Sequence, residues 1–162
     1  MKKFISLLLS LVCMFSLTGC FSDLSSLFGM GNMEPDKVIV KMQKYLDDSD
    51  LKKDNMYYKI EYDEDFQNYV LTLSHPEMND LAVASIRYVY KNSSVSGSGE
   101  LVKAWDNLTE MAKQASKDVE AKIRTYDDDA YLVVNLVNYD NQEDILLSVS
   151  GGVVLENLLD LY

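Results

Sequence analysis

The chain has 162 residues, a length that suits one ordinary domain with an apolar core of its own and is too short for two. Its 26 acidic and 15 basic residues give a formal net charge of −11, which would repel nucleic-acid phosphates and anionic membrane or wall polymers. We therefore expect no nucleic-acid partner, and we interpret the acidic surface as one that keeps the domain dispersed.

Residues 1–20 have the pattern of an export signal. Two lysines precede an apolar run over residues 4–17, which is short for a membrane span, and small residues follow the run. Two other interpretations stay open, an uncleaved transmembrane anchor and an ordinary secretory signal in which a cysteine falls near the cleavage point by chance. The agreement of charge, apolar length, small residues and cysteine favours a lipid-processed signal over both.

The last four residues of this segment, Leu17-Thr18-Gly19-Cys20, resemble the lipobox of bacterial prolipoproteins. The resemblance covers residues 1–20 only. It implies that residues 1–19 are a signal peptide removed after Gly19, and that the Cys20 thiol receives a diacylglyceryl group. Because two or more acyl chains hold a protein stably on a membrane, the resemblance implies an extracytoplasmic lipoprotein anchored to the bacterial membrane through Cys20.

If the signal is processed in this way, neither cysteine is part of the folded domain's chemistry. Cys13 would leave with the signal peptide and Cys20 would carry the lipid, so the remaining domain would have neither a thiol nor a disulfide. We interpret residues 20–35 as the lipidated cysteine followed by a flexible tether. Apolar residues between positions 21 and 28 leave a short interfacial helical turn as the alternative.

A single domain is expected over residues 36–162, beginning with a helix and a hairpin. Pro35 at a first-turn position and the apolar stripe after it predict a helix that ends within the acidic segment 47–50. Alternating side chains over residues 57–62 and 69–73, on either side of the acidic turn 63–65, predict a β-hairpin.

The next segment allows two interpretations. Ser74-His75-Pro76-Glu77 has the S-x-x-E spacing of a capping box, which predicts a helix over residues 75–91. Residues 81–90 are also rich in β-forming side chains, so a strand stays open as the alternative.

The clearest expected element is a long helix over residues 101–123, where apolar residues recur at steps of three and four. Strands are expected over residues 130–139, 144–150 and 153–155. The last two would join through a two-residue turn at Gly151-Gly152.

These elements predict an α+β fold, a two-layer sandwich with an antiparallel sheet of four to five strands and helices packed on one face. A rough αββ unit occurs twice, which makes a duplication possible. The layout resembles small lipoproteins of unknown function and, more loosely, the two αββ units of β-lactamase-inhibitory proteins.

No pattern in the sequence predicts a catalytic residue, a cofactor or a metal site. His75 is the single histidine, and its place at the expected helix cap favours a structural role. Acidic clusters at residues 47–50, 63–65, 127–129 and 140–144 fall at expected turns and lack the spacing of a Ca²⁺ loop. A hydrolytic site assembled in space from scattered Ser, Asp, Glu and His75 stays open.

Eleven tyrosines are the other compositional feature. Tyr57, Tyr58, Tyr62 and Tyr69 would place rings on both faces of one hairpin, and an exposed aromatic face can bind peptide or sugar, although tyrosine also suits a half-buried strand. We therefore expect a non-catalytic binding or accessory module of the bacterial envelope, whose partner is an unknown protein or envelope component. The alternative is a small envelope hydrolase.

Overall fold

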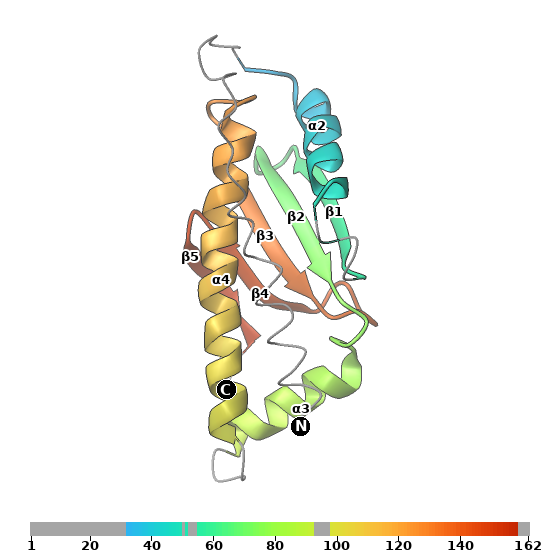
Figure 1. The fold of residues 1–162 in the computed structure, drawn as a ribbon, viewed down its shortest axis with the longest axis vertical. Helices are drawn as coiled ribbons and strands as arrows, with labels where there is room; N and C mark the ends of the chain where they lie inside the picture. The colour runs from blue at the N-terminus through green and yellow to red at the C-terminus, as the bar shows by residue number, and fades with distance from the viewer. Residues whose placement is uncertain (1–31, 50, 52–54, 93–97, 159–162) are drawn as a thin grey trace.

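The computed structural model of the protein describes residues 32–49, 51, 55–92 and 98–158 (Figure 1). The chain has an α+β fold, as predicted, and its described residues form three helices and one sheet of five strands. The elements in chain order are α2 (Pro35–Asp47), β1 (Tyr57–Asp63), β2 (Asn68–Ser74), α3 (Asp80–Lys91), α4 (Ser98–Arg124), β3 (Leu132–Val137), β4 (Ile145–Ser150) and β5 (Val153–Asn157). Cys20, the signal segment 1–19 and residues 20–31 of the expected tether lie outside the described residues.

The sheet is mixed, which corrects the expectation of a wholly antiparallel one. Its strand order is β1-β2-β3-β4-β5, and three neighbouring pairs are antiparallel, but β2 and β3 are parallel. The reason lies in the connection between them. Helix α4 has 27 residues, a length of about 40 Å, so it carries the chain back to the end of the sheet from which β2 started.

This topology gives no support to a duplication of the αββ unit. The units α2-β1-β2 and α4-β3-β4 pack their helices on the same core, and each ends in an antiparallel hairpin. The two units can be compared from the helix side, each turned so that its first strand points upward. Because β2 and β3 are parallel neighbours, the second strand then lies on one side of the first strand in one unit and on the other side in the other unit. Because α2 and α4 cover the same face of the sheet, the two helix-plus-hairpin units have opposite hands and cannot be superposed by a rotation.

Helices α2 and α4 cover one face of the sheet, as the sequence predicted. Helix α2 packs against β1, and α4 crosses β3, β4 and β5 (Figure 1). The buried side of α4 repeats at helical spacing, with Trp105, Leu108, Ala112, Val119 and Ile123 all 4% exposed or less. Helix α3 lies differently, at the end of the sheet where β2 and β3 finish, and contacts α4. None of the helices in the described residues is long and apolar enough to cross a membrane.

Helix α3 settles the ambiguity of residues 75–91 in favour of a helix, but the helix begins five residues later than expected. Its N-cap is Asn79, whose side chain accepts a hydrogen bond from the backbone N–H of Ala82 at 3.1 Å. Ser74 is the last residue of β2, and its hydroxyl is buried without a hydrogen-bond partner. The predicted capping box is therefore wrong, because the pairing of β2 holds Ser74 in the sheet.

The hairpin between β4 and β5 turns at Gly151 and Gly152, as predicted. Both residues have positive φ, 52° and 82°, which a two-residue turn between twisted antiparallel strands requires. The Gly152 N–H also donates to the Ser116 hydroxyl on α4 at 3.0 Å, so the turn is held against the long helix.

The last residues of the expected tether contact the domain. The Met33 N–H donates to the carbonyl of Tyr126 at 2.9 Å, and the Asn32 side chain bonds the Asp128 N–H and the Asp129 carboxylate, at 3.3 and 3.4 Å. These contacts fix the chain at the start of α2 beside the loop that leads into β3.

Candidate functional site

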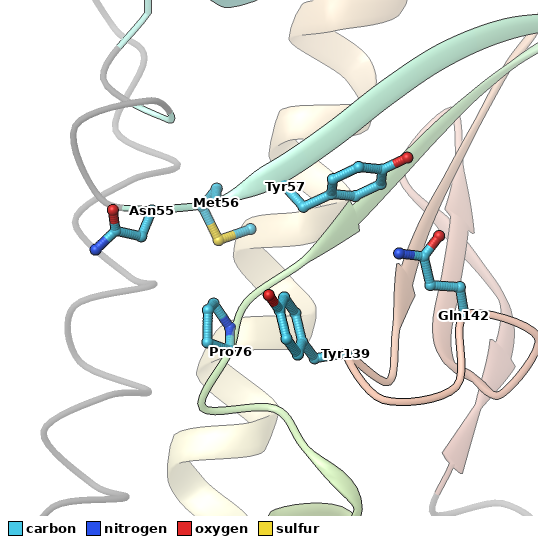
Figure 2. Close-up of a pocket in the computed structure, with 6 residues that line it drawn as sticks. All are labelled: Asn55, Met56, Tyr57, Pro76, Tyr139 and Gln142. Carbon is cyan, nitrogen blue, oxygen red and sulfur yellow. The ribbon is translucent and has the colours of Figure 1, made fainter.

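The described residues form a pocket at the end of the sheet where β2 and β3 finish. It has a volume of about 630 Å³, and Figure 2 shows the residues that line it. They come from three places: the start of β1, the connection from β2 to α3, and the loop between β3 and β4. The lining residues are Asn55, Met56, Tyr57, Pro76, Tyr139 and Gln142.

The parallel pairing of β2 and β3 explains why a pocket forms here. The carboxyl ends of parallel strands meet at one edge of a sheet, so the segments that follow them lie side by side. A backbone hydrogen bond of 2.9 Å from the N–H of Tyr139 to the carbonyl of Met78 joins the two segments. This bond fixes Tyr139 close to Pro76, which precedes Met78 by two residues.

Two half-exposed tyrosines dominate the lining. Tyr57 at the start of β1 is 40% exposed, and Tyr139 after β3 is 43% exposed. In Figure 2 the two rings come from different sides of the opening, and the Gln142 side chain extends toward the space between them. Pro76 and Met56 complete the apolar part of the lining, while Asn55 lies at its outer edge. A ring face beside a side-chain amide suits binding of a small group or a peptide side chain.

The four tyrosines singled out in the sequence do not form one aromatic surface. Only Tyr57 lines the pocket. The Tyr58 hydroxyl donates to Asp47 on α2 at 2.7 Å, and the Tyr62 ring packs edge to face on Tyr69 with 5.1 Å between centroids. Tyr69 is 1% exposed, and its hydroxyl donates to Asp127 at 2.8 Å. These three tyrosines therefore have structural contacts, which agrees with the general preference of tyrosine for strands.

Sequence reasoning missed Tyr139 as a site residue. It stands at the end of an expected strand, directly before the acidic turn 140–143, and a residue at a strand end next to a loop is a common place for a binding side chain. The sequence does not show that Tyr139 and Tyr57 line the same pocket, because Tyr139 follows β3, Tyr57 begins β1, and these two strands are not neighbours in the sheet.

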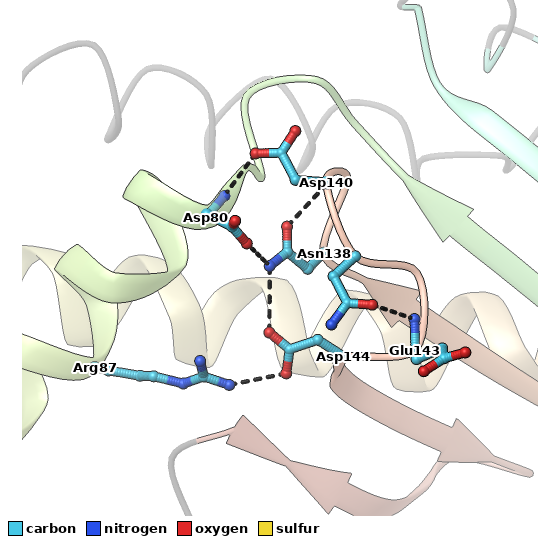
Figure 3. A network of polar contacts seen from close by, with 7 residues as sticks. Asp80, Arg87, Asn138, Asp140, Glu143 and Asp144 are labelled. Carbon is cyan, nitrogen blue, oxygen red and sulfur yellow. Dashed lines mark hydrogen bonds and ion pairs between the residues drawn. The ribbon is translucent and has the colours of Figure 1, made fainter.

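A polar network is centred on Asn138, the residue that precedes Tyr139 of the pocket (Figure 3). Asn138 is 2% exposed, and its amide nitrogen donates to Asp80 at 2.7 Å and to Asp144 at 3.2 Å. Its amide oxygen accepts from the N–H of Asp140 at 3.1 Å, and Arg87 on α3 pairs with Asp144 at 2.8 Å. A buried amide with several satisfied bonds fixes the loop between β3 and β4, and hence the position of Tyr139.

The same network occupies the N-terminus of α3, where a bound anion would otherwise be favoured. The N–H of Asp80 donates to the Asp140 carboxylate at 3.1 Å, and the N–H of Ala82 donates to Asn79. The helix end is therefore filled by the side chains of the protein.

The residues considered for hydrolysis or metal binding have structural surroundings. The Ser74 hydroxyl is fully buried, and Nδ1 of His75 accepts a hydrogen bond from the N–H of Glu77 at 3.2 Å. Asp63 caps its own turn by accepting from the N–H of Asp65 and of Phe66. Among the described residues, no three His, Cys, Asp or Glu side chains are grouped so that they could hold a metal ion.

Comparison with known proteins adds no relative: no family model, no curated protein and no solved structure matches the chain. A proposal about its function therefore rests on its own residues.

Proposed function

We propose that the protein is an extracytoplasmic lipoprotein, anchored to the bacterial membrane by lipid on Cys20, that acts as a non-catalytic binding or accessory module. The observation that carries the proposal is the sequence Leu17-Thr18-Gly19-Cys20 after two lysines and an apolar run. Lipid on this cysteine would hold residues 32–158 at the membrane surface, where two or more acyl chains give stable attachment.

The pocket supports binding as the role of the domain. The lining residues that the structure describes include two half-exposed tyrosines and two side-chain amides; among them is no carboxylate, imidazole or thiol, and the carboxylates of Glu77 and Glu143 belong to residues that follow the lining in sequence. General acid–base and nucleophilic catalysis mostly use such groups, and less often a tyrosine hydroxyl, within hydrogen-bond reach of the substrate. The lining is therefore better suited to hold a ligand than to transform it, and the partner would be a protein or another envelope component.

A small envelope hydrolase that depends on His75 is the alternative. His75 directly precedes Pro76 of the pocket, which places it near the lining, but its Nδ1 already accepts a backbone N–H. Full burial of Ser74 keeps that hydroxyl from reaching a substrate. These two observations favour the binding module.

Metabolic labelling with an alkyne analogue of palmitate tests the anchor. The full-length protein and a Cys13→Ser variant, which serves as the matched control, are both expected to take up the label in a bacterial host. A Cys20→Ser variant is expected to take up none and to leave the membrane fraction, because the acceptor thiol is missing. Label on the Cys20→Ser variant would contradict lipid attachment at Cys20.

A further inference from the structure

We propose that the pocket binds the cationic side chain of a basic peptide segment, a lysine or an arginine, held between Tyr57 and Tyr139. This inference rests on the proposed binding function and names the chemistry of the ligand. Two independent features of the pocket carry it, the exposed aromatic rings and the charge of the segments around them.

The rings of Tyr57 and Tyr139 can accept a cation. A lysine or arginine head group within about 6 Å of a tyrosine ring is attracted by the negative face of the ring. The same chain already uses this interaction elsewhere, because the Nζ atoms of Lys41 and Lys122 lie 5.1 and 5.6 Å from the centre of the Tyr126 ring. Tyr57 and Tyr139 are 40% and 43% exposed, so both can be reached from solvent.

Two of the three segments that line the pocket carry an excess of negative charge, while the segment before β1 contains two lysines and one aspartate at positions 52–54. The connection after β2, the first residue of α3 and the loop after β3 together contain five carboxylates, and Arg87 forms an ion pair with one of them, Asp144. These five carboxylates are Glu77, Asp80, Asp140, Glu143 and Asp144.

Two of these carboxylates remain available to a ligand. Glu77 follows Pro76 of the lining and Glu143 follows Gln142, and both are exposed. The nearest cation on β1, Lys59, pairs with Glu61 at 2.7 Å and also interacts electrostatically with Tyr57, two residues before it on the strand. A cation in the pocket would therefore have more carboxylates than cationic side chains in the segments around it, which also fits the net charge of −11 on the whole chain.

A neutral sugar could also stack on the tyrosines and bond the amides of Asn55 and Gln142. Such a ligand would gain nothing from Glu77 and Glu143, whereas a lysine or arginine would use both the rings and the carboxylates. The observed charge therefore favours the basic peptide.

Isothermal titration calorimetry of the full-length protein in a neutral detergent tests the proposal with three probes. These are hexalysine, the same peptide acetylated on every side-chain amine, and chitotriose. Hexalysine is expected to bind, to weaken as salt is raised, and to bind more tightly than the acetylated peptide, because acetylation removes the cation.

Matched variants locate the binding. Tyr57→Ala and Tyr139→Ala are each expected to weaken hexalysine binding about 3- to 10-fold, while Tyr139→Phe keeps the ring and most of the affinity. Tyr131→Ala is the control, since Tyr131 is 45% exposed but lies before β3, at the opposite end of that strand. Glu143→Gln is expected to weaken binding about 2- to 5-fold, and Glu64→Gln, in the turn after β1, to leave it unchanged.

Three results would overturn the proposal. Hexalysine binding that is equal in all variants would mean attachment to the acidic surface at large. Chitotriose binding that is lost in Tyr139→Ala, without binding of hexalysine, would leave the binding function intact but make the ligand class wrong. If none of the three probes binds, the proposal of a cationic ligand is wrong. The proposed function would then still be tested separately, by palmitate labelling and by crosslinking in cells.

Discussion

Tyr69 joins the middle of the sheet to the loop that leads into β3. Its ring lies in the core at 1% exposure, and its hydroxyl donates to the Asp127 carboxylate at 2.8 Å. Burial, together with the hydrogen bond and negative charge of Asp127, raises the pKa of the Tyr69 phenol well above its usual value. The folded protein therefore holds this proton more tightly than the unfolded chain does.

The sign of the pKa shift predicts an alkaline loss of stability. The contribution of Tyr69 is complete below pH 10, the pKa of an unfolded tyrosine, and falls above it by about 1.4 kcal/mol per pH unit. Tyr69→Phe should cost about 1.5 to 3 kcal/mol at pH 7, because it removes a hydrogen bond to a carboxylate. Since phenylalanine does not titrate, the difference from wild type should shrink between pH 9 and pH 11.

Urea denaturation at pH 7, 9 and 11 measures this difference, with Tyr131→Phe at an exposed position as the control. A difference between wild type and Tyr69→Phe that stays constant up to pH 11 would show that Tyr69 does not titrate differently in the two states.

At the scale of elements, the β4–β5 hairpin and the long helix α4 stabilise each other. The turn at Gly151-Gly152 allows β5 to fold back, and its N–H at Gly152 bonds Ser116 on α4. At the other end of β5, the indole N–H of Trp105 on α4 donates to the side chain of Asn157 at 3.0 Å. The edge strand is thus attached to the helix at both ends.

Two glycine substitutions should change stability in opposite directions. Gly152 has a φ of 82°, so Gly152→Ala should destabilise the protein by about 1 to 2 kcal/mol. The added Cβ would also displace the flexible end of the Lys117 side chain. Gly99 lies in the first turn of α4 with nothing within 4 Å of an added Cβ, and Gly99→Ala should stabilise by about 0.5 to 1 kcal/mol. Urea denaturation should show a lower unfolding midpoint for Gly152→Ala and a higher one for Gly99→Ala than for wild type. A change of the same sign and size in both variants would contradict the positive φ of Gly152 in the β4–β5 turn.

The sequence allowed prediction of the elements that local patterns determine. The stripe of α4, the alternation of β1 and β2, and the glycine pair before β5 each act over a few residues. The start of α3 was mispredicted because Asn138 and Asp140, about sixty residues away, hold Asp80 at the helix start. The parallel pairing of β2 with β3, and with it the placement of Tyr57 and Tyr139 around one pocket, also depends on contacts that no local pattern contains.

At the scale of the whole molecule, the first described residues, Asn32 and Met33, and the pocket lie at opposite ends of the sheet. Asn32 and Met33 bond the loop before β3, whereas Tyr139 follows the end of β3 (Figure 1). A strand of about seven residues spans roughly 23 Å. If lipid on Cys20 anchors the chain through the residues before Asn32, this arrangement favours a pocket directed away from the membrane, where a partner can reach it.

Photo-crosslinking in living cells tests the binding function most directly. A photoreactive amino acid at position 142 should give a discrete crosslinked product that is lost in the Tyr57→Ala, Tyr139→Ala double variant and kept in His75→Ala. The same group at position 131 is the control and should not give that product. A product that survives the double variant, or the absence of any product from position 142, would contradict a binding role for this pocket.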